Sequence, residues 1–319
     1  MLDPQVQALL ERIAAAKRPS LHTLTPAQAR EEYLRSRRAL NPDPPDVASV
    51  VDRTIPGPGG PLPIRIYRAG GTQPNERLPV LVYFHGGGFT IGNLDTHDVV
   101  CRGFANAAYC AVVSVDYRLA PEHKFPAAVE DAVAATHWIA ANASDLAVDT
   151  ERLAIGGDSA GGNLATVAAL IARDNGGPKI VFQLLIYPPT HPPHNTESAK
   201  RLGQGYMQTR EVINYFRSNY IRSPADFDDW RVAPLLAPDL SRLPPTFILT
   251  GGYDMLVDEG KAYADRLAAS GVDVTYKCYE GMIHGFITMG KVIDAANRAV
   301  EECGRALAST FEKERAISR

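Results

Sequence analysis

The stretch from Gly157 to Gly161 constrains the fold of this chain more than any other. It reads Gly-Asp-Ser-Ala-Gly, follows the apolar run 153–155, and precedes an Ala- and Leu-rich run over 163–172 that predicts a helix. Strand, tight turn with a central serine, and helix form the context in which G-x-S-x-G is a nucleophile elbow. The motif alone is weak, because glycine and serine are also common in ordinary turns. Together with its flanks it predicts that Ser159 exposes its hydroxyl above a sheet, in a strained backbone conformation.

A second glycine-rich turn, His85-Gly86-Gly87-Gly88, follows the apolar run 78–84, which predicts a buried strand. Its backbone N–H groups could stabilise negative charge that develops on a carbonyl oxygen. In hydrolases with an elbow, the residue after the nucleophile, here Ala160, adds its own N–H. A flexible turn and a phosphate-binding loop are the alternatives. The second is disfavoured, because no Lys-Ser or Lys-Thr follows the glycines and the G-x-G-x-x-G spacing is absent.

Chain order limits which residues can act together with Ser159. Proteins with an elbow carry the nucleophile first, then an acid, then a histidine. Of the eight histidines, only His191, His194 and His284 follow the serine, and His284 alone also follows a carboxylate, Asp254, at the end of a predicted strand. His191 and His194 lie in a Pro-rich loop and are interpreted as solvated. The three candidates all follow predicted strands, where active-site groups collect in open α/β sheets.

Two further carboxylates compete for a role near these candidates. Asp258 is the rival of Asp254 as the acid, but we interpret it as the cap of a helix that runs to residue 269. Asp158 directly precedes the candidate serine, yet its spacing directs its side chain away from the candidate histidine. A structural, hydrogen-bonding role is therefore predicted for Asp158.

Four motifs occur together and in order: HGGG at 85–88, DYRLAPE at 116–122, GDSAGG at 157–162 and YDMLVDE at 253–259. This combination resembles the hormone-sensitive-lipase-like branch of the α/β-hydrolase esterases. The resemblance extends from about residue 45 to near the C-terminus, whereas the N-terminal stretch and residues 190–225 match only loosely. It implies a serine carboxylesterase for small to medium acyl esters.

The resemblance also implies a role for each candidate residue. The catalytic triad would be Ser159, Asp254 and His284, and the oxyanion hole would be Gly86, Gly87 and Ala160. Such an enzyme works through an acyl-enzyme intermediate and requires no metal or organic cofactor. An amide or lactone hydrolase with the same triad is the main alternative. A non-catalytic small-molecule receptor is a second one, but receptors derived from this fold are expected to lose the nucleophile or the base.

The order of strand and helix patterns predicts the α/β-hydrolase fold. About eight strands, with helices between the later ones, indicate a mostly parallel sheet covered on both faces. Strands over 47–55 and 62–67, joined by Pro-Gly-Pro-Gly-Gly-Pro, are expected to pair antiparallel. Residues 46–187 and 231–319 form the expected core.

Two segments lie outside that core and are expected to form a helical cap. In residues 1–45, Asp3-Pro4 and the capping box at Thr25 predict two helix starts, and Pro42 ends the second helix near Asn41. A helical extension packed elsewhere is the alternative. Residues 188–230 are first Pro-rich and then aromatic, which is typical of a lid insertion that lines an acyl pocket.

Composition and charge narrow the remaining possibilities. The chain has 33 basic and 36 acidic residues, a net charge of −3, which gives no reason to expect nucleic acid or an anionic membrane as a partner. No run approaches the ~18 apolar residues of a membrane span, and the N-terminus lacks a signal-peptide pattern, so a cytoplasmic protein is predicted. The four cysteines lack metal-ligand spacing.

Two smaller expectations concern the surface. Arg35, Arg37 and Arg38 are the one notable basic cluster, and we expect them in the last turn of a helix, where cations are favourable. A homodimer through an edge strand near residues 274–279 is expected by family resemblance. Whether the protein is a monomer or a homodimer, the expected binding partner is a small-molecule ester.

Overall fold

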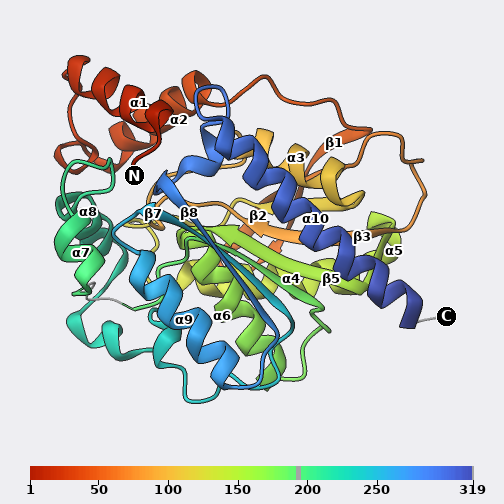
Figure 1. The fold of residues 1–319 in the computed structure, drawn as a ribbon. Coiled ribbons are helices and arrows are strands. Elements are labelled where there is room, and N and C mark those ends of the chain that lie inside the picture. Colours follow the sequence, from red (N-terminus) through yellow and green to blue (C-terminus); the bar gives the residue numbers. More distant parts are fainter. Residues whose placement is uncertain (192–194, 318–319) are drawn as a thin grey trace.

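Within residues 1–191 and 195–317, which the computed structural model describes, eight strands form one sheet in the order β1-β2-β4-β3-β5-β6-β7-β8 (Figure 1). Strands β1 and β2 pair antiparallel with their neighbours, and the remaining pairs are parallel. The strands are β1 (Ser49–Gly57), β2 (Gly60–Arg68), β3 (Leu78–Phe84), β4 (Ala111–Val115), β5 (Val148–Asp158), β6 (Phe182–Ile186), β7 (Thr246–Tyr253) and β8 (Val274–Ile283).

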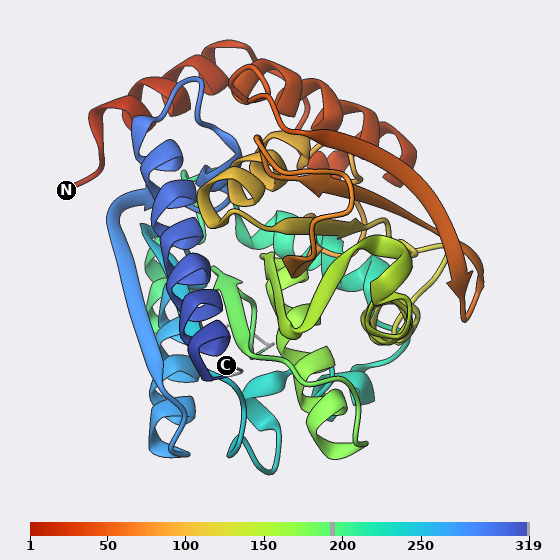
Figure 2. The same cartoon turned by 90° about the vertical axis from the view of Figure 1, so that its right-hand side faces the viewer.

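Helices connect the parallel strands and cover both faces of the sheet (Figure 2). The α-helices are α1 (Pro4–Ala15), α2 (Pro26–Leu40), α3 (Asp98–Ala108), α4 (Ala127–Ala141), α5 (Ala143–Leu146), α6 (Ala160–Asp174), α7 (Glu197–Leu202), α8 (Arg210–Tyr220), α9 (Val257–Ala269) and α10 (Asp294–Ile317). Short 3₁₀ turns are η1 (Leu21–Thr23), η2 (Pro224–Asp228), η3 (Pro234–Leu236) and η4 (Phe286–Thr288). Among these residues no helix is both long and apolar enough to cross a membrane, and this includes α10 with its 24 residues.

Strand β3 shows why the sheet needs cover on both faces. All seven of its residues are buried. Val82 and Phe84 belong to the core that includes residues of α4, α6 and α9, whereas Leu81 and Tyr83 belong to the core that includes residues of α3 and α10. A strand buried on both sides reads as a continuous apolar run, which is what the sequence shows at 78–84. The predicted α/β-hydrolase architecture is confirmed.

The first hairpin differs in extent from its prediction. The Pro-Gly-rich stretch was expected to be a linker, but β1 and β2 continue through it, with Pro56 opposite Pro61 and Gly57 opposite Gly60. Proline lacks the N–H that a central strand needs, but β1 lies at the edge of the sheet, where proline is tolerated. The antiparallel pairing itself is confirmed.

The helix starts predicted in the N-terminal segment are confirmed. The Asp3 side chain accepts a 2.8 Å hydrogen bond from the backbone N–H of Gln5, which caps α1. Thr25 and Gln28 form the capping box of α2, which ends with Asn41 as its C-cap. Helices α1 and α2 lie at the same end of the molecule as α7 and α8 (Figure 1). The turn η1 contacts α8, so the N-terminal segment and the segment after β6 meet.

Candidate active site

Ser159 occupies a sharp turn between β5 and α6, as the G-x-S-x-G motif predicts. Its φ of 52° and ψ of −122° lie where a residue with a side chain is strained. The Ser159 N–H donates to the carbonyl of Ile186 at 2.8 Å, which holds the turn against β6. A Cβ atom at Gly157 or at Gly161 would overlap the carbonyl oxygen of Phe84. Glycine is therefore required on both sides of the serine by close packing against β3.

Ser159, His284 and Asp254 form one hydrogen-bonded chain. The Nε2 atom of His284 lies 2.9 Å from Ser159 Oγ, and its Nδ1 atom lies 2.6 Å from Asp254 Oδ2. The second carboxylate oxygen of Asp254 accepts a 2.9 Å hydrogen bond from the N–H of Leu256. Asp254 is 1% exposed and His284 is 8% exposed, so the chain is shielded from bulk water except at the serine end. The fold thus brings together the three residues that chain order selected.

The secondary-structure elements around the three hydrogen-bonded side chains explain how these side chains are aligned. Asp254 directly follows β7 and His284 directly follows β8, so both side chains leave the carboxyl edge of the sheet beside the elbow. The His284 ring lies 4.5 Å from the ring of Tyr187, centroid to centroid, which limits its rotation. Gly285 follows with a φ of 76° and turns the chain into η4.

Asp158 has the structural role that its position predicted. Its buried carboxylate accepts hydrogen bonds from Tyr83 Oη at 2.8 Å and from the Gly86 N–H at 2.9 Å. The Nε2 atom of His97 lies 3.2 Å from the same carboxylate. Burial would raise the pKa of Asp158, but the charge and hydrogen bond of His97 and the Tyr83 hydroxyl outweigh it and lower the pKa to about 2. Asp158 therefore anchors the glycine-rich loop to the elbow.

This anchor corrects one expectation about the oxyanion hole. The N–H of Gly86 is engaged with Asp158 and does not face the pocket in front of Ser159. Gly87 and Gly88 do line that pocket, with φ values of 130° and 57°. Ala160 lines it as well, at the first position of α6. The expected set Gly86, Gly87 and Ala160 is thus wrong at Gly86, because the N–H direction is decided by a buried carboxylate beneath the loop.

Asp258 also departs from its interpretation as the cap of its own helix. It lies in the first turn of α9, but its carboxylate accepts a 2.7 Å hydrogen bond from the Ser198 N–H at the start of α7. The Ser198 hydroxyl in turn donates to the carbonyl of Met255. Asp258 therefore joins α7 to α9, while Asp254 is the carboxylate bound to the histidine.

The remaining histidines near these motifs have other surroundings. The backbone N–H of His191 donates to Glu259 at 2.8 Å, and the structure records no bond from His191 to Ser159. His194 lies outside the described residues. His85 is fully buried, stacks on Tyr117 with ring centroids 4.4 Å apart, and has its pKa lowered to about 3, chiefly by burial and then by His97.

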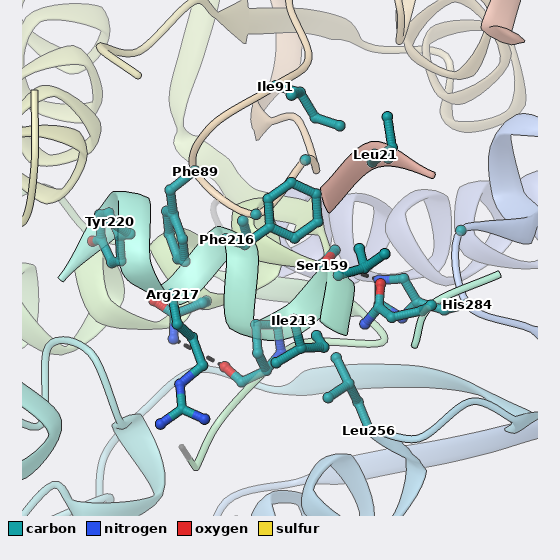
Figure 3. Close-up of a pocket in the computed structure, with 18 of the residues that line it drawn as sticks. Leu21, Phe89, Ile91, Ser159, Ile213, Phe216, Arg217, Tyr220, Leu256 and His284 are labelled. Atoms are coloured by element: carbon teal, nitrogen blue, oxygen red, sulfur yellow. Dashed lines mark hydrogen bonds between the residues drawn. The ribbon is translucent and has the colours of Figure 1, made fainter. Parts of the chain in front are cut away.

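The pocket above Ser159 is mostly apolar and has two sides (Figure 3). Phe89, Phe216 and Tyr220 extend from the serine on the side away from His284, and the rings of Phe89 and Tyr220 stack at 3.8 Å. Its wall combines residues of the N-terminal segment, the glycine loop, the 188–230 segment and the loop after β8. The residues that line the pocket include Leu21, Tyr33, Arg37, Phe89, Phe216, Arg217, Tyr220, Phe227 and Met289.

Arg37 lies in the last turn of α2, as predicted, but its burial in the pocket wall was not part of that prediction. Arg38 lies in the same last turn and is exposed, whereas Arg35, also exposed, lies just before that turn. Arg37, however, is only 3% exposed and faces the pocket. No local signal separates it from its neighbours, because the docking of α2 against η4 decides which side is covered.

Comparison with known proteins identifies the family. A family model described as the alpha/beta hydrolase fold matches residues 81–288. The chain is 42% identical to the carboxylic ester hydrolase LipN of Mycobacterium tuberculosis over 90% of this chain and 77% of LipN. It is 40% identical to the carboxylesterase NlhH of the same organism, over 97% and 95% of the two chains.

A solved structure agrees with these relatives. The ester-hydrolase EH1AB1 from the metagenome of Lake Arreo matches with a TM-score of 0.95 and 42% identity, over 98% of this chain and 100% of that chain. The sequence motifs, the sheet order and the similarity over nearly the whole chain all lead to the same family. The chain therefore belongs to the α/β-hydrolase fold family, in its hormone-sensitive-lipase-like branch of carboxylic ester hydrolases.

Proposed function

We propose that this protein is a serine carboxylesterase that hydrolyses small to medium acyl esters. The observation that carries the proposal is the bonded chain from Asp254 through His284 to Ser159, which opens into a largely apolar pocket. Relatives over most of its length are named carboxylesterase and carboxylic ester hydrolase, which supports the same reaction class.

In this mechanism Ser159 Oγ attacks the carbonyl carbon of the ester. His284 takes the hydroxyl proton at Nε2 and returns it to the leaving alcohol, which yields the acyl-enzyme. Asp254 holds the imidazole through Nδ1 and stabilises its protonated form. Water then attacks the acyl-enzyme by the same route and releases the acid. The three side chains suffice for these proton transfers.

The oxyanion hole that we propose consists of the backbone N–H groups of Gly87, Gly88 and Ala160. All three residues line the pocket at the serine, and Ala160 begins α6, whose N-terminus favours negative charge. Loss of one such donor typically costs 10²–10³ in kcat, so the loop geometry matters as much as the triad. Gly86 instead supports the hole from beneath through Asp158.

The proposed cap consists of residues 1–45 and 188–230. Leu21 and Tyr33 come from the first segment, and Phe216 and Tyr220 come from the second, and all of them line the pocket. Phe216 and Tyr220, together with the stacked Phe89, bound the space on the side of the serine away from His284. A bounded apolar space favours acyl groups of small to medium size over long chains.

The test compares wild type with Ser159→Ala on p-nitrophenyl esters whose acyl chains have from about two to about twelve carbons. The variant should lose about 10⁶-fold in kcat while its circular dichroism and thermal transition stay those of wild type. In wild type, kcat/KM should be highest at the short end of the series. Turnover that survives in the folded variant would refute the assignment of Ser159.

A second measurement separates ester hydrolysis from amide or lactone hydrolysis. Matched p-nitrophenyl ester, anilide and lactone substrates with the same acyl group are compared on wild type. The ester should have the highest kcat/KM, because p-nitrophenolate leaves more easily than p-nitroaniline or the alkoxide of a lactone. A higher value for the anilide or for the lactone would replace the proposed substrate class and leave the triad in place.

A further inference from the structure

Arg37 is a buried cation in the pocket wall, and none of the carboxylates in the described ranges forms an ion pair with it. It is 3% exposed and lines the same pocket as Ser159. Arg30 and Arg35 of the same helix each form an ion pair, with oxygen atoms at 2.6 Å and 3.1 Å. Within the described part of the chain, Arg37 forms no such pair. A buried charge is costly unless a counter-charge or several hydrogen bonds compensate it, so this arrangement favours an anion in the pocket.

Only part of the Arg37 guanidinium is engaged by the protein. Its Nη1 atom donates to Thr288 Oγ1 at 2.5 Å, and its Nε atom lies 3.4 Å from the hydroxyl oxygen of Ser36. The guanidinium carbon lies 4.9 Å from the ring centroid of Tyr33. Among the described residues Nη2 has no hydrogen-bond partner, and Arg37 is one of the residues that line the pocket. The guanidinium is thus held by Thr288 and Ser36, and it keeps N–H donors that no described residue accepts.

The carboxylates closest to the reaction centre are engaged elsewhere. Asp254 binds His284 and the N–H of Leu256, and Asp158 binds Tyr83, Gly86 and His97. Neither can turn to neutralise Arg37 without breaking those contacts. The anion that fits Arg37 would therefore come with the ligand.

The location of Arg37 assigns it to one part of the substrate. His284 must reach the leaving oxygen to protonate it, so the alcohol portion of an ester lies on the His284 side of Ser159. Gly285 and Met289, from the loop after His284, line the pocket on that side. Thr288, which binds Arg37, belongs to the same loop, and its hydroxyl also donates to the Gly285 carbonyl at 3.1 Å.

We propose that Arg37 binds a carboxylate on the alcohol portion of the ester, so that acyl esters of hydroxycarboxylic acids are preferred substrates. This inference rests on the proposed function. A guanidinium donates planar, charge-assisted hydrogen bonds to a carboxylate, and such bonds are stronger than neutral ones. Because the pocket is largely apolar, water competes less for these donors than it would at the surface.

The test uses two acetate esters of nearly the same shape that differ in charge: 2-acetoxypropanoate and 2-acetoxypropanamide. For each enzyme the measured quantity is the ratio of the two kcat/KM values. Wild type should prefer the carboxylate, and Arg37→Met should lower the ratio about tenfold to hundredfold. Arg37→Lys should retain part of the preference, because it keeps the charge but loses the planar fork. A ratio removes any general loss of activity, since both substrates use the same triad.

Two other arginines provide matched controls. Arg38→Met changes an exposed neighbour in the same helix turn and should leave both rates and their ratio unchanged. Arg217 lines the pocket near Phe227, with 4.4 Å from guanidinium to ring centroid. A ratio that falls in Arg217→Met but not in Arg37→Met would overturn the proposal. So would an equal loss of both rates in Arg37→Met, which is the result expected if Arg37 only holds the loop at Thr288.

A binding measurement separates failure of this inference from failure of the proposed function. Titration calorimetry follows 2-acetoxypropanoate binding to Ser159→Ala and to the Ser159→Ala, Arg37→Met double variant. The double variant should bind at least about tenfold more weakly. Equal affinities would overturn the role of Arg37 whatever the kinetics show. If wild type hydrolyses no ester while binding still depends on Arg37, the proposed function fails and the anion site stands.

Discussion

The backbone N–H of Gly86 donates a 2.9 Å hydrogen bond to the carboxylate of Asp158, the residue directly before Ser159. This bond joins the glycine-rich loop after β3 to the elbow after β5, which are neighbouring strands in the sheet. The two parts of the site that hold the serine and the oxyanion donors are therefore fixed relative to each other by one buried side chain.

Replacement of Asp158 should weaken both the fold and the reaction. Asp158→Asn removes the negative charge that His97, Tyr83 and Gly86 share, and loss of one partner in a buried pair costs about 3–5 kcal/mol. We also expect kcat to fall about tenfold to hundredfold, because the loop donors shift relative to the serine. Urea denaturation and p-nitrophenyl acetate kinetics measure the two effects. Asp43→Asn, at an exposed position, is the matched control.

Acidification should destabilise the protein through His85. Burial lowers its pKa from 6.5 to about 3 in the folded state, so the unfolded chain binds more protons between those values. The free energy of unfolding should fall as pH drops from 6.5 towards 3, by up to about 1.4 kcal/mol per pH unit from this group. Asp116, whose pKa burial raises to about 6, acts in the opposite direction over part of this window.

The variant His85→Gln isolates that contribution. Urea denaturation of wild type and variant between pH 7 and pH 4 should show stability curves that converge as pH falls. The exposed His123, changed in His123→Gln, serves as the control and should follow the wild-type curve. A pH-independent difference between wild type and His85→Gln would contradict the assigned pKa.

Gly88→Ala should impair catalysis through a clash that a second substitution can relieve. A Cβ atom at Gly88 would overlap the ring of Phe216, a side chain of α8. We expect kcat/KM for p-nitrophenyl acetate to fall about tenfold to hundredfold, because the displaced loop misaligns its N–H donors. In the Gly88→Ala, Phe216→Ala double variant most of the loss should be regained relative to Phe216→Ala alone.

Two other glycines test this explanation. At Gly87 the added Cβ would overlap the backbone carbonyl of Ile91, so truncation of Phe216 should not rescue Gly87→Ala. Gly176 also has a positive φ, 66°, but has open space around it, so Gly176→Ala should leave kcat/KM unchanged. Full activity in Gly88→Ala would show that the loop does not need this close approach to α8.

Much of the site was predictable because short motifs determine local geometry. The elbow required strand, turn and helix in immediate succession, and chain order then left His284 and Asp254 as the matching partners of Ser159. The capping signals at Asp3 and Thr25 acted within four residues, and both predicted helix starts are confirmed.

The errors concern side chains and N–H groups whose partners are distant in sequence. Gly86 faces a carboxylate 72 residues later instead of the pocket. Asp258 accepts a hydrogen bond from the Ser198 N–H of α7, 60 residues earlier, instead of capping its own helix. The prediction of its helix turn left the burial of Arg37 open, and that burial involves Thr288, 251 residues later.

By itself the sequence determined the elements, their order and the three residues of the bonded chain, because these follow from local periodicity, turn chemistry and the order of the motifs. The tertiary structure alone decided which glycine N–H groups face the pocket and which member of a basic cluster lines it. Hydrogen-bond direction and burial depend on the atoms that packing brings opposite a residue, and no local pattern contains that information.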